Sequence, residues 1–229
     1  MFSLISTSRP EGGEDVKIYI DGCDKQSIDL AEKFEIGITT NPTIIFSECA
    51  KRSLFELIGF FSQIKVPEIF LHVEKSYEDI VECLDTKKFV IKLPWVEENY
   101  ELSVLLKKKG FRVCATAVYE LSQLITALTL NVDFVAFYYD RASKKGIDPE
   151  KRICEFMEII SKNHSDTRVI VASLKNANQI LSAVKTGVSH ITIPVDLFKE
   201  FVKVPEYVLV DVRKFSEDLK KISISERKK

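Results

Sequence analysis

Short apolar, β-branched runs alternate with longer amphipathic stretches along the chain, from residue 17 almost to its end. Strands buried on both faces are near-continuous apolar runs, and the segments IFLHV, FVIKL and RVIVAS have this pattern. The pattern predicts strands at Lys17–Asp21, Gly37–Thr39, Glu68–Val73, Phe89–Leu93, Arg112–Ala115, Phe134–Ala136, Arg168–Ala172 and His190–Ile193. Helical spacing predicts helices at Lys25–Phe34, Leu54–Phe61, Tyr77–Leu84, Glu97–Lys109, Tyr119–Leu130, Pro149–Ser161, Ala177–Lys185, Asp196–Val202 and about Glu206–Ile222.

Repeated βα units at a spacing of roughly 20–35 residues favour the α/β class and a single (β/α)8 TIM barrel. The predicted helix bounds have fitting end residues: Asp148 and Pro149 are typical of a helix start, and Gly110 and Gly187 of a helix end. We expect an N-terminal extension at 1–16, the barrel with its terminal helix at 17–222, and a charged tail at 223–229. An open flavodoxin-like sheet is the alternative fold.

Composition limits the class of partner. The chain has 33 basic and 34 acidic residues, so its net charge of −1 favours neither nucleic acid nor an anionic membrane. No apolar run approaches the roughly 18 residues that span a bilayer, and the first 13 residues do not resemble a signal peptide. The five cysteines lack metal-ligand spacing, which indicates free thiols in a reducing compartment. We therefore expect a cytoplasmic protein.

Chemistry in such a barrel takes place at the carboxyl ends of the strands, where the loops gather. Polar residues end or follow seven of the predicted strands: Asp21; Thr39, Thr40 and Asn41; His72; Lys92; Thr116; Tyr138 and Arg141; Ser173 and Lys175. We expect their side chains to converge on one mouth. Taken singly, each has a plainer interpretation, such as a helix cap for Asp21, a turn for TTNP, or solvated surface charges for Arg141 and Lys175.

Lys92 lies in the apolar segment FVIKLPW and should lose part of its hydration on folding. Desolvation disfavours an ammonium and favours the neutral amine, which can attack a carbonyl carbon and form an imine. The imine then draws electrons from the neighbouring C–C bond. An ion-paired lysine, or one that extends its amine to solvent, is the alternative for this residue alone.

Six blocks in register resemble the small transaldolase and fructose-6-phosphate aldolase family: YIDGCD, GITTNPTII, VIKLP, TAVYELSQLITAL, VASLK and HITIPVDLF. The match runs in order and without large gaps from about Lys17 to Val210. The resemblance implies an enzyme that acts on sugar phosphates without a metal or organic cofactor, because the imine is the electron sink. It also implies a homo-oligomer, with the terminal helix as a candidate contact.

The resemblance assigns a role to each candidate residue. Lys92 corresponds to the Schiff-base lysine, Asp21 to the acid/base, and Thr116 to the threonine that helps to hold the water used as proton carrier. Asn41 corresponds to the asparagine that binds the hydroxyls of the dihydroxyacetone unit. The residues expected to bind substrate are Thr39, Thr40, Asn41, Ala136, Arg141, Ser173 and Lys175, of which the last three fall where the family grips the phosphate.

Three residues resemble the aldolase branch of the family, which releases free dihydroxyacetone. Tyr138 stands where transaldolases usually have phenylalanine, and its hydroxyl can position the water that attacks the imine. Ala136 and Cys114 stand where transaldolases tend to have serine and asparagine. A true transaldolase of the pentose phosphate pathway, which passes the three-carbon unit to an aldose phosphate, is the alternative.

Other residues depart from the family pattern. His72 stands where the family has glutamine or glutamate as a ligand of the same water, and its protonation would add a pH dependence. Phe137 replaces a common proline, Trp95 adds bulk beside the lysine, and Ala142–Asp148 does not resemble the usual loop. These departures bear on substrate preference more than on chemistry. His72 alone favours the alternative of a non-catalytic barrel that binds sugar phosphate. Another Schiff-base barrel, of the deoxyribose-phosphate aldolase kind, is a third alternative, in which Lys175 would be the second lysine.

Overall fold

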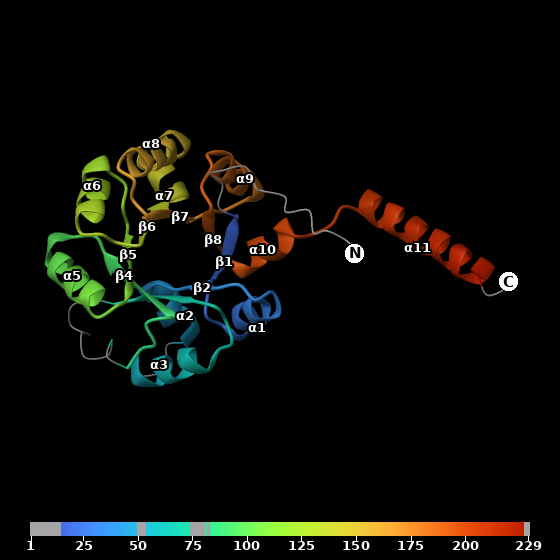
Figure 1. Ribbon diagram of the computed structural model, residues 1–229, viewed down its shortest axis with the longest axis horizontal. Helices are drawn as coiled ribbons and strands as arrows, with labels where there is room; N and C mark the ends of the chain where they lie inside the picture. Colours follow the sequence, from blue (N-terminus) through green and yellow to red (C-terminus); the bar gives the residue numbers. More distant parts are fainter. Residues whose placement is uncertain (1–14, 50–53, 74–80, 82, 227–229) are drawn as a thin grey trace, which may run out of the picture.

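The computed structural model describes residues 15–49, 54–73, 81 and 83–226, and its strands form a closed parallel barrel (Figure 1). The strands are β1 (Lys17–Asp21), β2 (Ile38–Thr39), β3 (Ile69–His72), β4 (Phe89–Pro94), β5 (Arg112–Thr116), β6 (Phe134–Tyr138), β7 (Arg168–Ala172) and β8 (His190–Ile193). β1 pairs in parallel with both β2 and β8, which closes the sheet. The predicted (β/α)8 fold is therefore confirmed, and the open flavodoxin-like alternative is wrong.

Helices surround the barrel, as Figure 1 shows. They are α1 (Lys25–Lys33), α2 (Pro42–Cys49), α3 (Leu54–Gln63), the short 3₁₀ helix η2 (Glu97–Asn99), α5 (Tyr100–Lys108), α6 (Leu121–Thr129), α7 (Tyr139–Ser143), α8 (Pro149–Lys162), α9 (Ala177–Lys185), α10 (Val195–Phe201) and α11 (Glu206–Glu226). The helix predicted at Tyr77–Leu84 lies largely outside the described residues. The predicted end residues are in place, since Asp148 caps α8 and Gly110 and Gly187 have φ of 83° and 92°.

Two helices, α2 and α7, were missed by the sequence pattern. α2 has the sequence PTIIFSEC, whose β-branched and aromatic residues have no helical periodicity. It begins because Asn41 Oδ1 accepts a hydrogen bond from the Ile44 amide at 3.0 Å and Pro42 takes the first helical position. α7 is a single short segment that starts directly after β6, so it is too short for a periodic signal.

The strands separate two hydrophobic cores. The inner core fills the barrel and consists of Tyr19, Phe70, Val90, Cys114, Phe134, Ala136 and Ile170. The outer core lies between strands and helices and takes alternate strand residues, such as Ile20, Ile91, Leu93, Val113 and Phe137. Successive side chains of a strand point to opposite faces. Each strand therefore has one set of positions that faces the barrel interior and another that faces the helices.

The last helix, α11, extends away from the barrel (Figure 1). Along it, an apolar stripe at helical spacing is formed by Val208, Val212, Phe215, Leu219 and Ile222. The last four of these side chains are 50–69% exposed. Among the described residues, no helix is both long enough and apolar enough to cross a membrane.

Candidate active site at the barrel mouth

Strand alternation directs the predicted chemistry into the barrel. On β4, Val90 belongs to the inner core while Ile91 and Leu93 belong to the outer core, so Lys92 faces the interior. The same count applies to Thr116, two residues after Cys114 on β5, and to the other strand-end candidates. Asp21 follows Tyr19, His72 follows Phe70, and Tyr138 follows Ala136, each by two positions. Strand alternation thus directs the side chains of these residues to the same, inner face of the barrel.

Lys92 is almost completely buried, with 4% of its surface exposed. Its Nζ donates a hydrogen bond to the Thr40 carbonyl at 2.9 Å. In register on the two neighbouring strands stand His72 and Cys114. Burial raises the pKa of the Cys114 thiol to about 12, and the charge of Lys92 acts in the opposite direction, which agrees with their closeness. The Lys92 amine is therefore held inside the barrel, by a backbone carbonyl and between strands that carry His72 and Cys114.

Asp21 ends β1 on the inner face, and its Oδ1 accepts a hydrogen bond from Thr39 Oγ1 at 2.8 Å. Burial raises the pKa of this carboxyl group, while the Thr39 hydrogen bond and the charges of Lys92, Lys175 and Arg141 lower it. A carboxyl group whose pKa is raised holds a proton more readily than a free aspartate, which suits a group that must both accept and return one.

The plainer interpretation of Asp21 as a helix cap is wrong. The residue that caps α1 is Asp24, whose side chain accepts from the Ser27 amide at 2.7 Å. Asp21 instead stays on the strand, where the carboxylate is held by a hydroxyl of β2. The Asp21 side chain is therefore directed into the barrel and does not cap the helix that follows.

Thr116 and Tyr138 form the second pair of the mouth. Their hydroxyl oxygens, from β5 and β6, lie 2.6 Å apart. Thr116 is buried, Tyr138 is half-buried, and Ala136 is the register partner of Thr116. Two hydroxyls in contact offer one spare donor and several lone pairs, which is the combination that holds a water molecule.

The cationic side of the mouth is formed by exposed side chains after β6 and β7. The Arg141 guanidinium stands over the Tyr138 ring, 4.9 Å from its centroid. The Asp140 amide, next to Arg141, donates to the Ser173 carbonyl at 3.2 Å, so α7 and the end of β7 lie together. Ser173 has a left-handed backbone, with φ of 61°. Lys175 is exposed just beyond it. The two cations and the hydroxyl are thus gathered from two adjacent strand ends.

The TTNP segment makes hydrogen bonds to other parts of the site through both its backbone and its side chains. Thr40 is buried, and its hydroxyl donates to the Phe70 carbonyl at 3.0 Å, while its own carbonyl accepts from Lys92. Asn41 uses its side-chain oxygen to cap α2, which leaves its NH₂ group as the donor it can offer a ligand. The interpretation of TTNP as a turn that starts a helix is therefore correct for Asn41, alongside any contact with substrate.

The expectation that Trp95 adds bulk beside Lys92 is wrong. Trp95 directly follows β4 and belongs to the outer core, where it packs on Tyr100 with ring centroids 4.8 Å apart. Its indole Nε1 donates to the Gln123 carbonyl at 3.0 Å. Phe137 is also an outer-core residue, packed on Phe156. Neither side chain limits the room inside the mouth.

One polar residue of the mouth was missed by sequence reasoning. Thr192, on β8, is buried, and its Oγ1 lies 2.6 Å from Thr39 Oγ1. A signal was present, because Thr192 is the one hydroxyl in the apolar segment ITIP, and it stands two residues after His190 on the inward-facing set.

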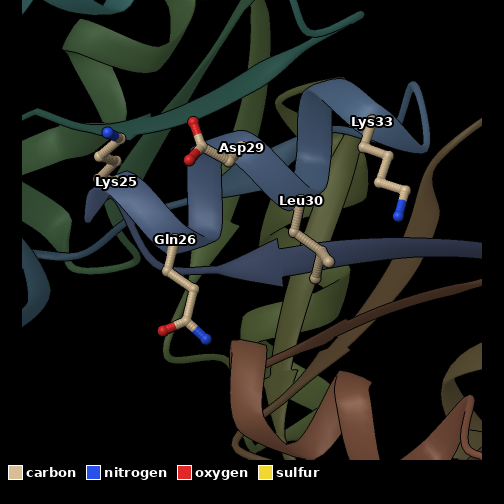
Figure 2. A pocket seen from close by; sticks show the side chains of 5 residues that line it. All are labelled: Lys25, Gln26, Asp29, Leu30 and Lys33. Atoms are coloured by element: carbon tan, nitrogen blue, oxygen red, sulfur yellow. The ribbon is translucent and has the colours of Figure 1, made fainter.

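Two hollows lie elsewhere on the surface. One, of about 370 Å³, runs along α1, and Figure 2 shows the side chains that line it projecting from the helix: Lys25, Gln26, Asp29, Leu30 and Lys33. The other, of about 680 Å³, is lined by Ile125, Leu128, Thr129, Asn131, Ile159, Asn163 and Ser165. Neither contains a candidate residue. Within the described part of the chain, no group of three or more His, Cys, Asp or Glu residues is arranged to hold a metal ion.

A (β/α)8 barrel that presents a buried amine, a carboxyl group and paired hydroxyls at its mouth has the groups of an enzyme of the aldolase type. A family model described as transaldolase/fructose-6-phosphate aldolase matches residues 73–228, which is more than half of the chain. The protein belongs to this transaldolase/fructose-6-phosphate aldolase family. The match includes Lys92, Thr116 and Tyr138, and the barrel closes Asp21 and the TTNP segment, which precede it, around the same mouth.

Proposed function

We propose that this enzyme cleaves or transfers the dihydroxyacetone unit of a ketose phosphate, fructose 6-phosphate or sedoheptulose 7-phosphate, through an imine on Lys92. We propose further that it acts mainly as an aldolase. The observation that carries this proposal is the buried Lys92 amine, 4% exposed, in the electrostatic neighbourhood of Asp21. An amine beside a carboxyl group is the pair that imine formation and proton transfer from a sugar hydroxyl require.

In the proposed mechanism the Lys92 amine attacks the C2 ketone of the sugar, and loss of water gives a protonated imine. Asp21 then accepts the proton of the C4 hydroxyl. The C3–C4 bond breaks, its electron pair moves into the imine to give an enamine, and an aldose phosphate leaves. In the aldolase branch the enamine is protonated at C3, and water attacks the resulting imine and releases dihydroxyacetone. In the transferase branch C3 of the enamine instead attacks the aldehyde carbon of a second aldose phosphate, and water then releases the new ketose phosphate from the imine.

Binding of the substrate is assigned to both sides of the mouth. Arg141 and Lys175, with the Ser173 hydroxyl between them in sequence, would hold the phosphate by charge-assisted hydrogen bonds. The Asn41 amide group would donate to a hydroxyl of the dihydroxyacetone unit. Both assignments are supported by the way α7 lies against the end of β7 and by the orientation that the α2 cap gives Asn41.

The preference for the aldolase branch is supported by the contact of Thr116 Oγ1 with Tyr138 OH at 2.6 Å. A water bound to this pair would have a fixed oxygen lone pair for attack on the imine. His72, in register with Lys92, is a further candidate ligand of that water. A phenylalanine in place of Tyr138 would leave only the Thr116 hydroxyl, which is the reason transfer would then compete better with hydrolysis.

Borohydride trapping tests the covalent step. Wild-type protein incubated with fructose 6-phosphate and borohydride should gain a reduced adduct, which peptide mass spectrometry should locate on Lys92. Lys92→Ala and Lys92→Arg should form no adduct and show no turnover, because neither supplies a neutral amine. Lys175→Ala is the control, since it removes the other lysine of the mouth and should keep the adduct at saturating substrate. An adduct in Lys92→Ala would overturn the assignment.

The alternatives give different results in the same experiment. A transaldolase would form the adduct and transfer the unit to erythrose 4-phosphate, but release almost no dihydroxyacetone. A non-catalytic barrel would bind the sugar phosphate and form no adduct. A Schiff-base barrel of the deoxyribose-phosphate aldolase kind would be trapped by deoxyribose 5-phosphate instead.

We also propose that α11 contacts another copy of the chain in a homo-oligomer. The proposal is supported by the exposed apolar stripe on a helix that extends away from the barrel. Phe215→Glu together with Leu219→Lys should shift the sedimentation coefficient to that of a smaller species. The control is Glu217→Lys, which changes a charge of the same helix outside the stripe. A wild-type protein that sediments as a monomer would contradict the proposal.

A further inference from the structure

Thr192 belongs to a chain of hydrogen bonds inside the barrel. Its Oγ1 lies 2.6 Å from Thr39 Oγ1, and Thr39 Oγ1 donates to Asp21 Oδ1 at 2.8 Å. Both hydroxyls are buried, with 1–2% of each residue exposed. Side chains from β8, β2 and β1 therefore form one connected chain that ends on the carboxyl group of the proposed acid/base.

Counting protons fixes the direction of this chain. A threonine hydroxyl has one hydrogen and two lone pairs, and a carboxylate has no hydrogen. When Asp21 is ionised, the single hydrogen of Thr39 must go to Oδ1. Thr39 can then only accept in its contact with Thr192, so Thr192 must be the donor. Replacing the Thr192 hydroxyl by a methyl group would remove the donor that completes this arrangement.

We propose that Thr192 is a positioning residue that acts on Asp21 through Thr39, an inference that rests on the proposed function. In C–C cleavage the O–H bond of the substrate hydroxyl breaks, and the proton goes to the carboxylate. Thr192 polarises Thr39 and keeps its hydrogen on Oδ1, which leaves the other carboxylate oxygen to receive that proton. Hydrogen bonds in a buried chain strengthen one another, so the far hydroxyl contributes although it does not touch Asp21.

Other groups act on the same carboxylate. Lys92 from β4, Arg141 from α7 and Lys175 after β7 favour its charged form, whereas burial disfavours it. Two of these three cations are exposed and are screened by salt, but the hydroxyl chain is buried and neutral. The contribution of Thr192 should therefore remain at high ionic strength, where those of Arg141 and Lys175 decline.

The test is the pH dependence of kcat/KM for cleavage of fructose 6-phosphate. Thr192→Val, of nearly the same shape, should lower kcat/KM at the acidic end about two- to tenfold, because the carboxylate loses support. The acidic limb of the pH profile should move to higher pH, because the acid dissociation constant of Asp21 falls by the same factor. The shift should persist at about 0.5 M salt, where exposed charges are screened. Thr192→Ala removes the same hydroxyl without a new methyl group and should behave alike. Thr192→Ser keeps the hydroxyl and should restore the wild-type profile.

The control is Thr167→Val. Thr167 is equally buried, but its hydroxyl donates to the Val132 carbonyl at 2.7 Å at the opposite, amino end of the strands. This variant should keep the wild-type pH profile, whatever stability it loses. The yield of borohydride adduct on Lys92 should be unchanged in Thr192→Val, because imine formation does not depend on the hydroxyl chain.

Two outcomes would overturn the inference. One is a wild-type pH profile in Thr192→Val and Thr192→Ala, and the other is an equal displacement in Thr192→Ser, which would indicate packing. If the wild-type protein forms no adduct and cleaves nothing, the proposed function fails instead. The chain is then tested by ¹³C NMR of the Asp21 carboxyl carbon: a higher pKa in Thr192→Val supports it, and an unchanged pKa refutes it.

Discussion

Tyr138→Phe is the substitution that separates hydrolysis from transfer. It removes one oxygen, which lies 2.6 Å from Thr116 Oγ1, and keeps a ring that packs edge-on against Tyr119 with centroids 6.1 Å apart. The fold should therefore change little. Losing one hydrogen bond to a bound water costs about 0.5–1.5 kcal/mol, which is about two- to tenfold in rate. Release of free dihydroxyacetone should fall by this factor, while transfer to erythrose 4-phosphate is retained.

The assay measures both products from the same reaction, with and without erythrose 4-phosphate, and the borohydride adduct on Lys92 as the measure of imine formation. Thr116→Ser is the matched control, because it keeps the hydroxyl and loses only a methyl group. Tyr138→Phe with an unchanged ratio of release to transfer, together with a large loss of release in His72→Ala, would refute the role of Tyr138. The imidazole would then be the group that holds the water.

Three further predictions follow from single contacts. Asp21→Asn should abolish turnover and raise Tm at neutral pH. Because the pKa of Asp21 is raised in the folded state, the folded protein binds this proton more tightly than the unfolded chain, and stability decreases as pH rises through the folded-state pKa. The increase in Tm of the variant should vanish below about pH 3.9, the pKa of the unfolded state. Gly37→Ala should lower the unfolding free energy in urea by about 1–3 kcal/mol, because the added Cβ would lie 2.7 Å from the Tyr19 ring, whereas Gly59→Ala, with nothing within 4 Å, should not destabilise. Arg141→Ala should raise KM for a ketose phosphate about tenfold or more and leave an unphosphorylated ketose unaffected.

The strands were predictable because the strands of a parallel barrel are buried on both faces and therefore consist of near-continuous apolar runs. β1, β7 and β8 have the predicted bounds, and β4, β5 and β6 continue one or two residues further, through Pro94, Thr116 and Tyr138. Pro94 and Thr116 were left out because polar and cyclic residues end an apolar run, although their backbones still belong to the ladder. β2 and β3 are instead shorter than the predicted Gly37–Thr39 and Glu68–Val73. The same alternation placed Lys92 and Asp21 on the inner face, so the existence of a site was predictable as well.

What the sequence could not supply were contacts between residues far apart in the chain. Thr192 and Thr39 are 153 positions apart, and no local pattern links their hydroxyls. Trp95 was misplaced because nearness in sequence to Lys92 was taken for nearness in space, although odd and even strand positions face different cores. Asp24 and Asp21 are the same residue type, three positions apart, at the junction of β1 and α1. Only their hydrogen bonds distinguish the helix cap from the strand-end carboxylate.

The specificity of TTNP has a physical explanation, because its first two residues serve different groups of the site. Thr39 donates its hydroxyl hydrogen to Asp21, so it acts on the proposed acid/base. Thr40 offers its carbonyl to Lys92 and ties its own hydroxyl to the Phe70 backbone on β3, so it holds the amine. Serine could keep these hydrogen bonds, but it would leave gaps in place of two methyl groups, because Thr39 and Thr40 are both almost fully buried.

Asn41 and Pro42 complete the segment by turning the chain from β2 into α2. The Asn41 side-chain oxygen caps the helix and Pro42 supplies the fixed φ of its first turn, so together they set the direction in which the Asn41 NH₂ group points. Aspartate could cap the helix equally well, but when ionised it would offer no donor to a sugar hydroxyl. Asparagine is thus the residue that can cap the helix and still offer a donor, and the cap explains why a helix without a periodic pattern starts at the mouth of the barrel.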